Sequence, residues 1–261
     1  MKRILEKVKQ LPWKNILPLL WLVIPISLIG GLFTGMYTVE HTEGELLESL
    51  LSQFPDVKLF YFMTAIQSLV YAVLATVAGF LLANRIGLVK PLGFKKSILQ
   101  KTVPVILVLG ILFTCDYWVF GRLIPEVAAD YEKGISIPYF ISSLTYGGVI
   151  EEILLRWFVM SLIGWILVLL FARDKAADEI PVWIYMAANV LAAGLFAAGH
   201  LPATVMFFGG LTPLIVFRCF LMNGAFAIVF GRYYHKYGIQ YAMLAHFGLH
   251  LVHKVILMII I

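Results

Sequence analysis

Charged residues are scarce in this 261-residue chain. They make up 13% of it, whereas hydrophobic residues make up 61% and the mean hydropathy is +0.92. A soluble domain carries about 25% charged residues, so there is too little polar surface here to cover a water-soluble globule. Several membrane spans explain the excess of apolar residues. We therefore expect one integral membrane domain over residues 1–261, an all-α polytopic bundle of seven to eight membrane helices in the cell membrane.

Cysteine is almost absent, and so are several sequence signatures. Cys115 and Cys219 both lie inside apolar runs, without metal-like spacing or a disulfide framework, so we interpret them as small buried residues. The chain has no H-E-x-x-H sequence, which would mark a zinc-protease helix. It also has no internal repeat, and many transporters are built from such repeats. A transporter is therefore the least supported of the candidate functions.

The net charge of +5 does not indicate a nucleic-acid partner. The cations cluster at the ends of apolar runs, as membrane topology places them. Residues 1–15 and 85–101 are basic, whereas residues 40–58 are acidic, so we expect a cytoplasmic N-terminus. The uncharged run 16–39 is longer than the roughly 7–15 residues of a signal-peptide core, which predicts a retained first span.

The first half of the chain predicts three spans, at 16–39, 59–84 and 102–120. Gly31 and Gly35 have the small-xxx-small spacing that lets another helix approach closely. Asp116 interrupts the third span, where it faces either a polar cavity or the membrane interface.

Two topologies remain open after residue 136. Residues 137–172 would form a helix of about 54 Å, longer than the ~30 Å of a bilayer core. They cross once, with a break at Gly147-Gly148, or twice. The basic loop at Arg232 and Lys236 falls on the cytoplasmic side only if they cross once, which favours seven spans over eight.

The uncharged stretch 180–217 is long enough to contain a turn. We expect that turn at His200-Leu201-Pro202, because proline disfavours continuation of a helix. A further span then runs to about Phe230, with Gly209, Gly210 and Pro213 allowing a kink, and 239–261 forms the last helix.

Two adjacent carboxylates and a guanidinium interrupt an otherwise apolar run. Glu151, Glu152 and Arg156 would each cost roughly 2.5–3.5 kcal/mol at the centre of a membrane helix. Glu152 and Arg156 are four apart and can pair, which leaves Glu151, about 100° round the helix, to face a cavity. A desolvated carboxylate there is suited to activating water. The alternative is an interfacial charge cluster at a helix end.

Three histidines also lie in apolar surroundings on two other predicted helices. His246 and His250 are four apart, so they share one face, a spacing suited to two metal ligands or two hydrogen-bond donors. His200 ends the segment Phe196-Ala-Ala-Gly-His200. His253 extends the first face, but beside Lys254 we expect it at the interface. Together the glutamates and histidines predict a buried active site.

These residues resemble the motifs of the CAAX-protease and bacteriocin-processing (CPBP, or Abi) family of intramembrane proteases. Glu151-Glu152-Ile-Leu-Leu-Arg156 is similar to its E-E-x-x-x-R motif, and Phe196-Ala-Ala-Gly-His200 to its F-x-x-x-H motif. His246-Phe-Gly-Leu-His250 matches the first position of its H-x-x-x-N motif. The likeness covers 140–255, the expected catalytic core.

The resemblance implies a helical bundle that hydrolyses peptide bonds of a peptide or membrane-protein substrate within or beside the bilayer. It implies that Glu151 activates the water and that Glu152 and Arg156 support the site. It also implies that His200 and His246 position the water or stabilise the oxyanion.

His250 departs from the motif, which commonly has asparagine at this position. A histidine can donate a hydrogen bond to an oxyanion as an asparagine amide does, or it can complete a metal site. Zinc or another divalent metal therefore stays open, and so does a metal-free reaction. The four expected ligands are Glu151, His200, His246 and His250.

Two functions other than proteolysis are also compatible with these residues. The chain is alternatively a non-catalytic scaffold or bacteriocin self-immunity protein of the same fold, or a proton-coupled or metal transporter that uses the same residues as a relay or ion site.

Overall fold

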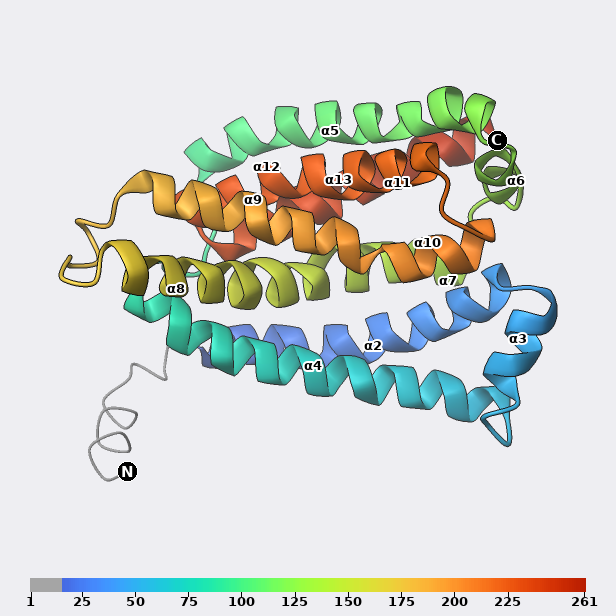
Figure 1. The fold of residues 1–261 in the computed structure, drawn as a ribbon, viewed down its shortest axis with the longest axis horizontal. Helices are drawn as coiled ribbons and strands as arrows, with labels where there is room; N and C mark the ends of the chain where they lie inside the picture. The colour runs from blue at the N-terminus through green and yellow to red at the C-terminus, as the bar shows by residue number, and fades with distance from the viewer. Residues whose placement is uncertain (1–15) are drawn as a thin grey trace.

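The computed structural model describes residues 16–261, which form helices joined by short connections and contain no strand (Figure 1). The elements are α2 (Leu17–His41), α3 (Gly44–Leu51), α4 (Val57–Arg85), α5 (Lys96–Leu123), α6 (Pro125–Glu132), α7 (Ile137–Ser142), η2 (Ser143–Ile150), η3 (Ile153–Met160), α8 (Ser161–Phe171), α9 (Val182–Gly199), α10 (Leu201–Phe208), α11 (Pro213–Cys219), η4 (Phe220–Ala225), α12 (Phe226–Tyr237) and α13 (Ile239–Ile260).

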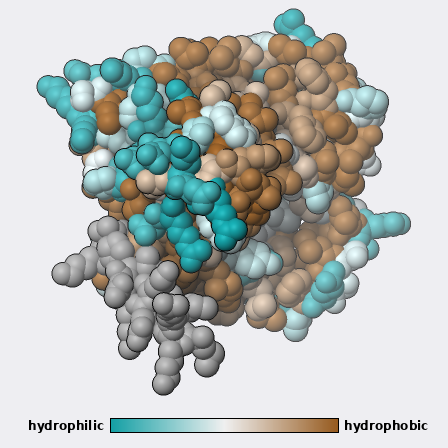
Figure 2. Space-filling model, turned by 60° about the vertical axis from the view of Figure 1, so that its left-hand side comes forward, coloured by the Kyte–Doolittle hydropathy of each residue, from teal (hydrophilic) through white to brown (hydrophobic). Residues whose placement is uncertain are grey.

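Seven of the described helices are long and apolar enough to cross a membrane. Large apolar side chains cover the flank of the bundle, among them Trp21, Leu74 and Leu170, which are 80%, 63% and 67% exposed. Figure 2 shows this apolar flank, with hydrophilic residues gathered toward its margins. The chain is therefore an integral membrane protein, as its composition predicts.

The fourth span crosses once, from Ile137 to Phe171, so the count is seven and the double crossing does not occur. The expected break at Gly147-Gly148 is wrong, because both glycines lie inside η2 and the helix continues. Gly148 instead provides room for α13: a Cβ there would lie 2.7 Å from the Cα of Phe247.

The expected turn at His200-Leu201-Pro202 is also wrong. Residues Val182–Phe208 form one span, and His200 keeps helical torsions (φ −85°, ψ −11°) between α9 and α10. Pro202 is tolerated because it lies in the first turn of α10, where a missing N–H removes no helical hydrogen bond. The chain reverses at Gly209, where a φ of 73° favours glycine. The sequence predicts only a kink at this position, and the structure has the turn there.

Small residues bring α2 and α4 together, as the spacing of Gly31 and Gly35 predicts. A Cβ on Gly31 would lie 2.7 Å from the carbonyl oxygen of Thr64, and a Cβ on Gly35 would collide with the hydroxyl of the same residue. The two helices form a hairpin beside the rest of the bundle (Figure 1).

Gly148→Ala should destabilise the fold, because the new methyl group would push α13 away from η2. Overpacking of this kind costs about 1–3 kcal/mol. Thermal unfolding in detergent measures the change. The matched control is Gly194→Ala in α9, where nothing lies within 4 Å of the added Cβ. That variant should gain about 0.5–1 kcal/mol from the lower backbone entropy of alanine. Equal stability of the two variants would contradict close packing at Gly148.

Candidate active site

The two glutamates lie between two widened helical turns, η2 and η3. The N–H of Glu151 bonds to the carbonyl oxygen of Tyr146, five residues back, as in a π-helix. Such turns are rare and occur mostly at functional sites. Here they position neighbouring carboxylates differently: Glu151 lines a cavity, whereas Glu152 is fully buried in the bundle.

Glu152 is the centre of a buried cluster of charged and polar groups. Its Oε1 lies 3.1 Å from Nη1 of Arg156 and 2.8 Å from Nδ1 of His246. The side chains of Glu152 and Arg156 are 0% and 2% exposed. The expected pairing with Arg156 is therefore present. His246, which the resemblance implies positions the water or stabilises the oxyanion, is bound through Nδ1 to Glu152.

Two aromatic rings surround this cluster. The guanidinium of Arg156 lies 4.8 Å from the ring of Phe196 and 5.5 Å from that of Phe230. Phe230 also stacks on His246, with ring centroids 4.4 Å apart and planes 18° apart. Cation–π contacts of this kind help to compensate a desolvated cation. The motif contains Phe196, but sequence reasoning missed the role of Phe230, because only the fold brings α12 against η3 and α13.

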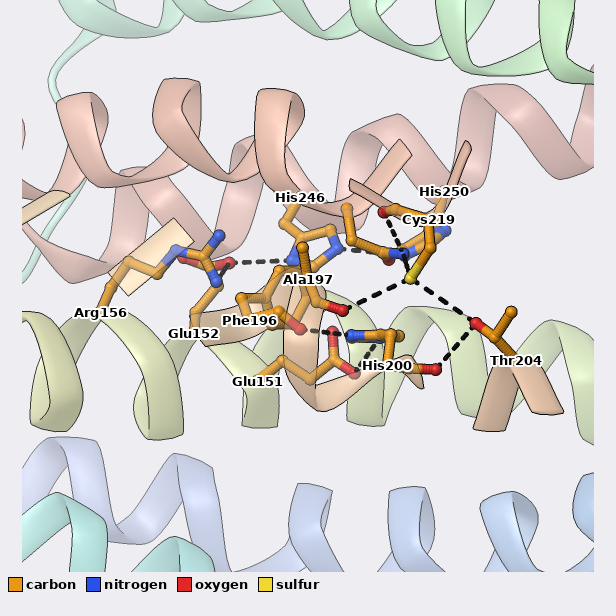
Figure 3. A network of polar contacts seen from close by, with 11 residues as sticks. Glu151, Glu152, Arg156, Phe196, Ala197, His200, Thr204, Cys219, His246 and His250 are labelled. Carbon is orange, nitrogen blue, oxygen red and sulfur yellow. Dashed lines mark hydrogen bonds and ion pairs between the residues drawn. The ribbon is translucent and has the colours of Figure 1, made fainter. Parts of the chain in front are cut away.

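Glu151 pairs with His200 on the cavity side. Its Oε1 lies 3.7 Å from Nε2 of His200, and the side chains are 16% and 31% exposed. The other ring nitrogen, Nδ1, lies 2.8 Å from the carbonyl oxygen of Phe196. A carbonyl only accepts, so Nδ1 donates the hydrogen bond and Nε2 faces Glu151 (Figure 3).

His250 lies one turn beyond His246 on α13, as the spacing of four predicts. The two Nε2 atoms are 3.1 Å apart. Nδ1 of His246 must donate to the carboxylate of Glu152, so Nε2 of His246 is the atom available to His250 and to the cavity. The facing residue is Gly147, whose Cβ would lie 3.1 Å from Nε2 of His250. Gly147 therefore makes room for the imidazole.

A cavity of about 300 Å³ joins these groups. Four of the six expected site residues line it, namely Glu151, His200, His246 and His250. Glu152 and Arg156 lie behind this wall. Asn223 of η4 also lines the cavity and donates to the carbonyl oxygen of Cys219. No sequence pattern marked Asn223, although an amide in an apolar run was a usable signal.

The expected zinc ligands do not form a metal site. Within residues 16–261, no group of three or more His, Cys, Asp or Glu side chains is arranged to hold a metal ion. Nδ1 of His246 is bound to Glu152, and its Nε2 lies within hydrogen-bond distance of His250. Glu151 and His200 form a separate pair.

A second buried ion pair lies between α5 and α11. Nε of Arg218 donates to Asp116 over 2.9 Å, and the hydroxyl of Tyr131 donates to the same carboxylate over 2.6 Å. Asp116 is 3% exposed and does not line the cavity. Burial and the charge of Asp116 raise the pKa of Tyr131 well above its usual value. Sequence reasoning missed Arg218 entirely.

His253, which we expect at the interface from the neighbouring Lys254, is buried inside the bundle together with that lysine. Both are 1% exposed. Nδ1 of His253 lies 3.1 Å from the hydroxyl of Thr114, and Nζ of Lys254 lies 3.1 Å from the ring centroid of Tyr139. The buried face of α13 that carries His246 therefore extends to His253 and Lys254, although the charge of Lys254 predicts an exposed position.

Comparison with known proteins agrees with the motifs. Residues 133–252 match the family model described as Type II CAAX prenyl endopeptidase Rce1-like. This segment belongs to the CPBP family. The CPBP segment contains the cavity-lining glutamate and all three cavity-lining histidines, and the family is one of proteases. No curated protein and no solved structure matches the chain.

Glu152→Gln should destabilise the protein, because it leaves Arg156 buried without its countercharge. Removal of one partner of a buried pair costs about 3–5 kcal/mol. Thermal unfolding in detergent measures the loss. The control is Glu151→Gln, one residue away on the cavity side, which should lose much less stability. A similar loss in both variants would argue against separate environments for the two glutamates.

Proposed function

We propose that the protein is an intramembrane endopeptidase that uses a glutamate-activated water. The observation that carries the proposal is that Glu151 and His200 face each other across 3.7 Å. They do so in the cavity that His246 and His250 also line. The match of residues 133–252 to a family of proteases supports peptide hydrolysis as the reaction. We place the catalytic core at 140–255.

Glu151 is the group suited to act as general base. Its carboxylate and the Nε2 atom of neutral His200 both accept hydrogen bonds, and 3.7 Å is too long for a direct bond between them. A water molecule has two O–H groups and can donate one to each acceptor. In the neutral ring, the Nδ1–H of His200 leaves Nε2 as the accepting nitrogen. This arrangement orients the water for attack on a peptide carbonyl.

His246 and His250 are the groups suited to stabilise the tetrahedral intermediate. In the neutral pair, one Nε2–H group lies between the two rings. That N–H can turn from the neighbouring imidazole to the oxyanion as negative charge develops on the oxygen. The carboxylate of Glu152 holds His246 by its Nδ1–H.

The proton transfers balance without another reactant. Glu151 takes a proton from water while the hydroxide oxygen bonds to the carbonyl carbon. The C–N bond then breaks as the protonated Glu151 gives that proton to the leaving amine. Glu152 and Arg156 touch no substrate in this scheme. They are positioning residues that hold His246, which agrees with their place behind the cavity wall.

Glu151→Gln should abolish cleavage of a membrane-proximal peptide, because an amide cannot take the proton. The loss of a general base lowers the rate by roughly 10²–10⁴-fold. Purified protein in liposomes, with cleavage followed on a gel, measures it, and unchanged thermal unfolding serves as the control. Undiminished cleavage would remove Glu151 from the mechanism. If wild type cleaves no membrane substrate and Glu151→Gln with His200→Ala keeps the cellular phenotype, the scaffold or immunity function holds instead.

Dialysis against a strong zinc chelator should leave the cleavage rate unchanged, because the described residues form no metal site. Metal analysis of the dialysed protein provides the control. Loss of activity on chelation, with recovery on addition of zinc, would contradict the metal-free reaction.

A further inference from the structure

The two ends of the bundle differ in charge. One end, here the acidic end, carries α3, α6 and the last turn of α13 (Figure 1). Its acids outnumber its bases, with Glu40, Glu43, Glu45, Glu48, Asp56, Glu126, Asp130 and Glu132 against Lys58, Arg122 and Lys133. The other end, the basic end, carries the connections after α4, α8 and α12. It has Arg85, Lys90, Lys95, Lys96, Lys101, Arg173, Lys175, Arg232 and Lys236 against Asp174, Asp178 and Glu179.

This asymmetry orients the protein. Lysine and arginine are enriched in cytoplasmic loops of membrane proteins, whereas acidic residues contribute little to orientation. The basic end therefore faces the cytoplasm, and the acidic end lies on the opposite side.

The cavity runs from the catalytic groups toward the acidic end. Its wall includes Tyr37, one turn before the end of α2, and Tyr139, in the first turn of α7. It also includes Phe207, the next-to-last residue of α10. Each of these helix ends belongs to the acidic end. Among the described residues, none of the connections 86–95, 172–181 and 238 at the basic end lines the cavity.

Aromatic contacts bridge α2 and α10 at the edge of the cavity. The ring of Phe207 lies 5.4 Å from that of Tyr37 and 6.2 Å from that of His41. Side chains on both helices line the space beneath these rings, including Thr34 and Met206. The acidic-end part of the cavity therefore lies between α2 and α10, beneath these rings.

The walls fit an apolar peptide. The cavity surface is mostly apolar, with the residues Phe113, Met206, Phe207, Met222 and Phe226. Hydroxyl groups of Thr34, Thr38, Ser142 and Ser143 lie among them and can bond backbone amides of a bound chain. No lysine or arginine lines the wall to bind an acidic side chain, within residues 16–261.

We propose that the substrate is an apolar peptide segment that reaches the site from the non-cytoplasmic side of the membrane. Such a segment belongs to a membrane-anchored or exported polypeptide and lies next to the outer surface of the bilayer. A cytoplasmic C-terminal tail would approach from the basic end, but none of the connections described at that end lines the cavity. The cleavage of this segment rests on the function proposed above, but the side from which the cavity is reached does not.

Cysteine labelling tests the side of access independently of catalysis. In a Cys115→Ala, Cys219→Ala background, single variants carry Ser143→Cys in the cavity wall, Glu45→Cys at the acidic end or Lys96→Cys at the basic end. A small charged methanethiosulfonate reagent is added to right-side-out or inverted vesicles. Ser143→Cys and Glu45→Cys should react in right-side-out vesicles, and Lys96→Cys only in inverted ones. Reaction of Ser143→Cys together with Lys96→Cys, or no reaction of Ser143→Cys where Glu45→Cys reacts, overturns the proposal.

Two single-span reporter proteins then test the substrate class. They carry the same apolar cleavable segment, placed just outside the membrane in one and just inside in the other. Co-expressed wild-type protein should cleave the outer segment at least tenfold faster, and Glu151→Gln should cleave neither. Faster cleavage of the inner segment overturns the substrate class while the protease function stands. Failure to cleave either segment, with the labelling as expected, counts against the protease function and the substrate class but leaves the access route in place.

Discussion

The fully buried carboxylate of Glu152 organises the site. A charge in this position is tolerable only if it is paired, and its two partners come from different parts of the chain: Arg156 from the same helix and His246 from the last helix. The contact with His246 fixes the rotation of α13 against η2 and η3. His250, one turn further along α13, then points at Gly147, and its Nε2 meets that of His246. The geometry of the histidine pair thus depends on the charge balance around Glu152.

Adjacent glutamates serve opposite electrostatic needs. In the reaction proposed above, Glu151 exchanges a proton with water, and it keeps 16% of its side chain exposed to the cavity. Glu152 holds His246 in place, and its side chain is 0% exposed between Arg156 and His246. The angle between successive residues of a helix separates the two carboxylates. The widened turns of η2 and η3 let this happen within one uninterrupted span.

The spacing of residues along the chain predicts the contacts within a single helix. It does not predict the contacts between segments that lie far apart in the sequence. The pairing of Glu152 with Arg156 and the shared face of His246 and His250 follow from a separation of four residues. The apolar runs predicted the spans, and the position of the basic loop favoured seven of them. The assignment of His246 to Glu152, rather than Glu151, depends on how α13 packs. So does the ion pair of Asp116 with Arg218, whose members lie 102 positions apart. The sequence predicts the turn at Pro202 and not at Gly209, because proline usually ends a helix but removes no hydrogen bond in the first turn of one.

The departure at position 250 from the family motif has a steric counterpart on the facing helix. An imidazole reaches further than an asparagine amide, and here its Nε2 lies where a Cβ on residue 147 would come within 3.1 Å. Glycine at 147 therefore accommodates the longer side chain without moving α13 away from η2. The neighbouring Gly148 permits the backbone approach that brings the two helices together. In this way the pair of glycines places the histidine pair opposite the glutamates. In the reaction proposed above, the asparagine of the motif is replaced by the imidazole of His250, whose Nε2–H lies against the ring of His246 and can turn to an oxyanion.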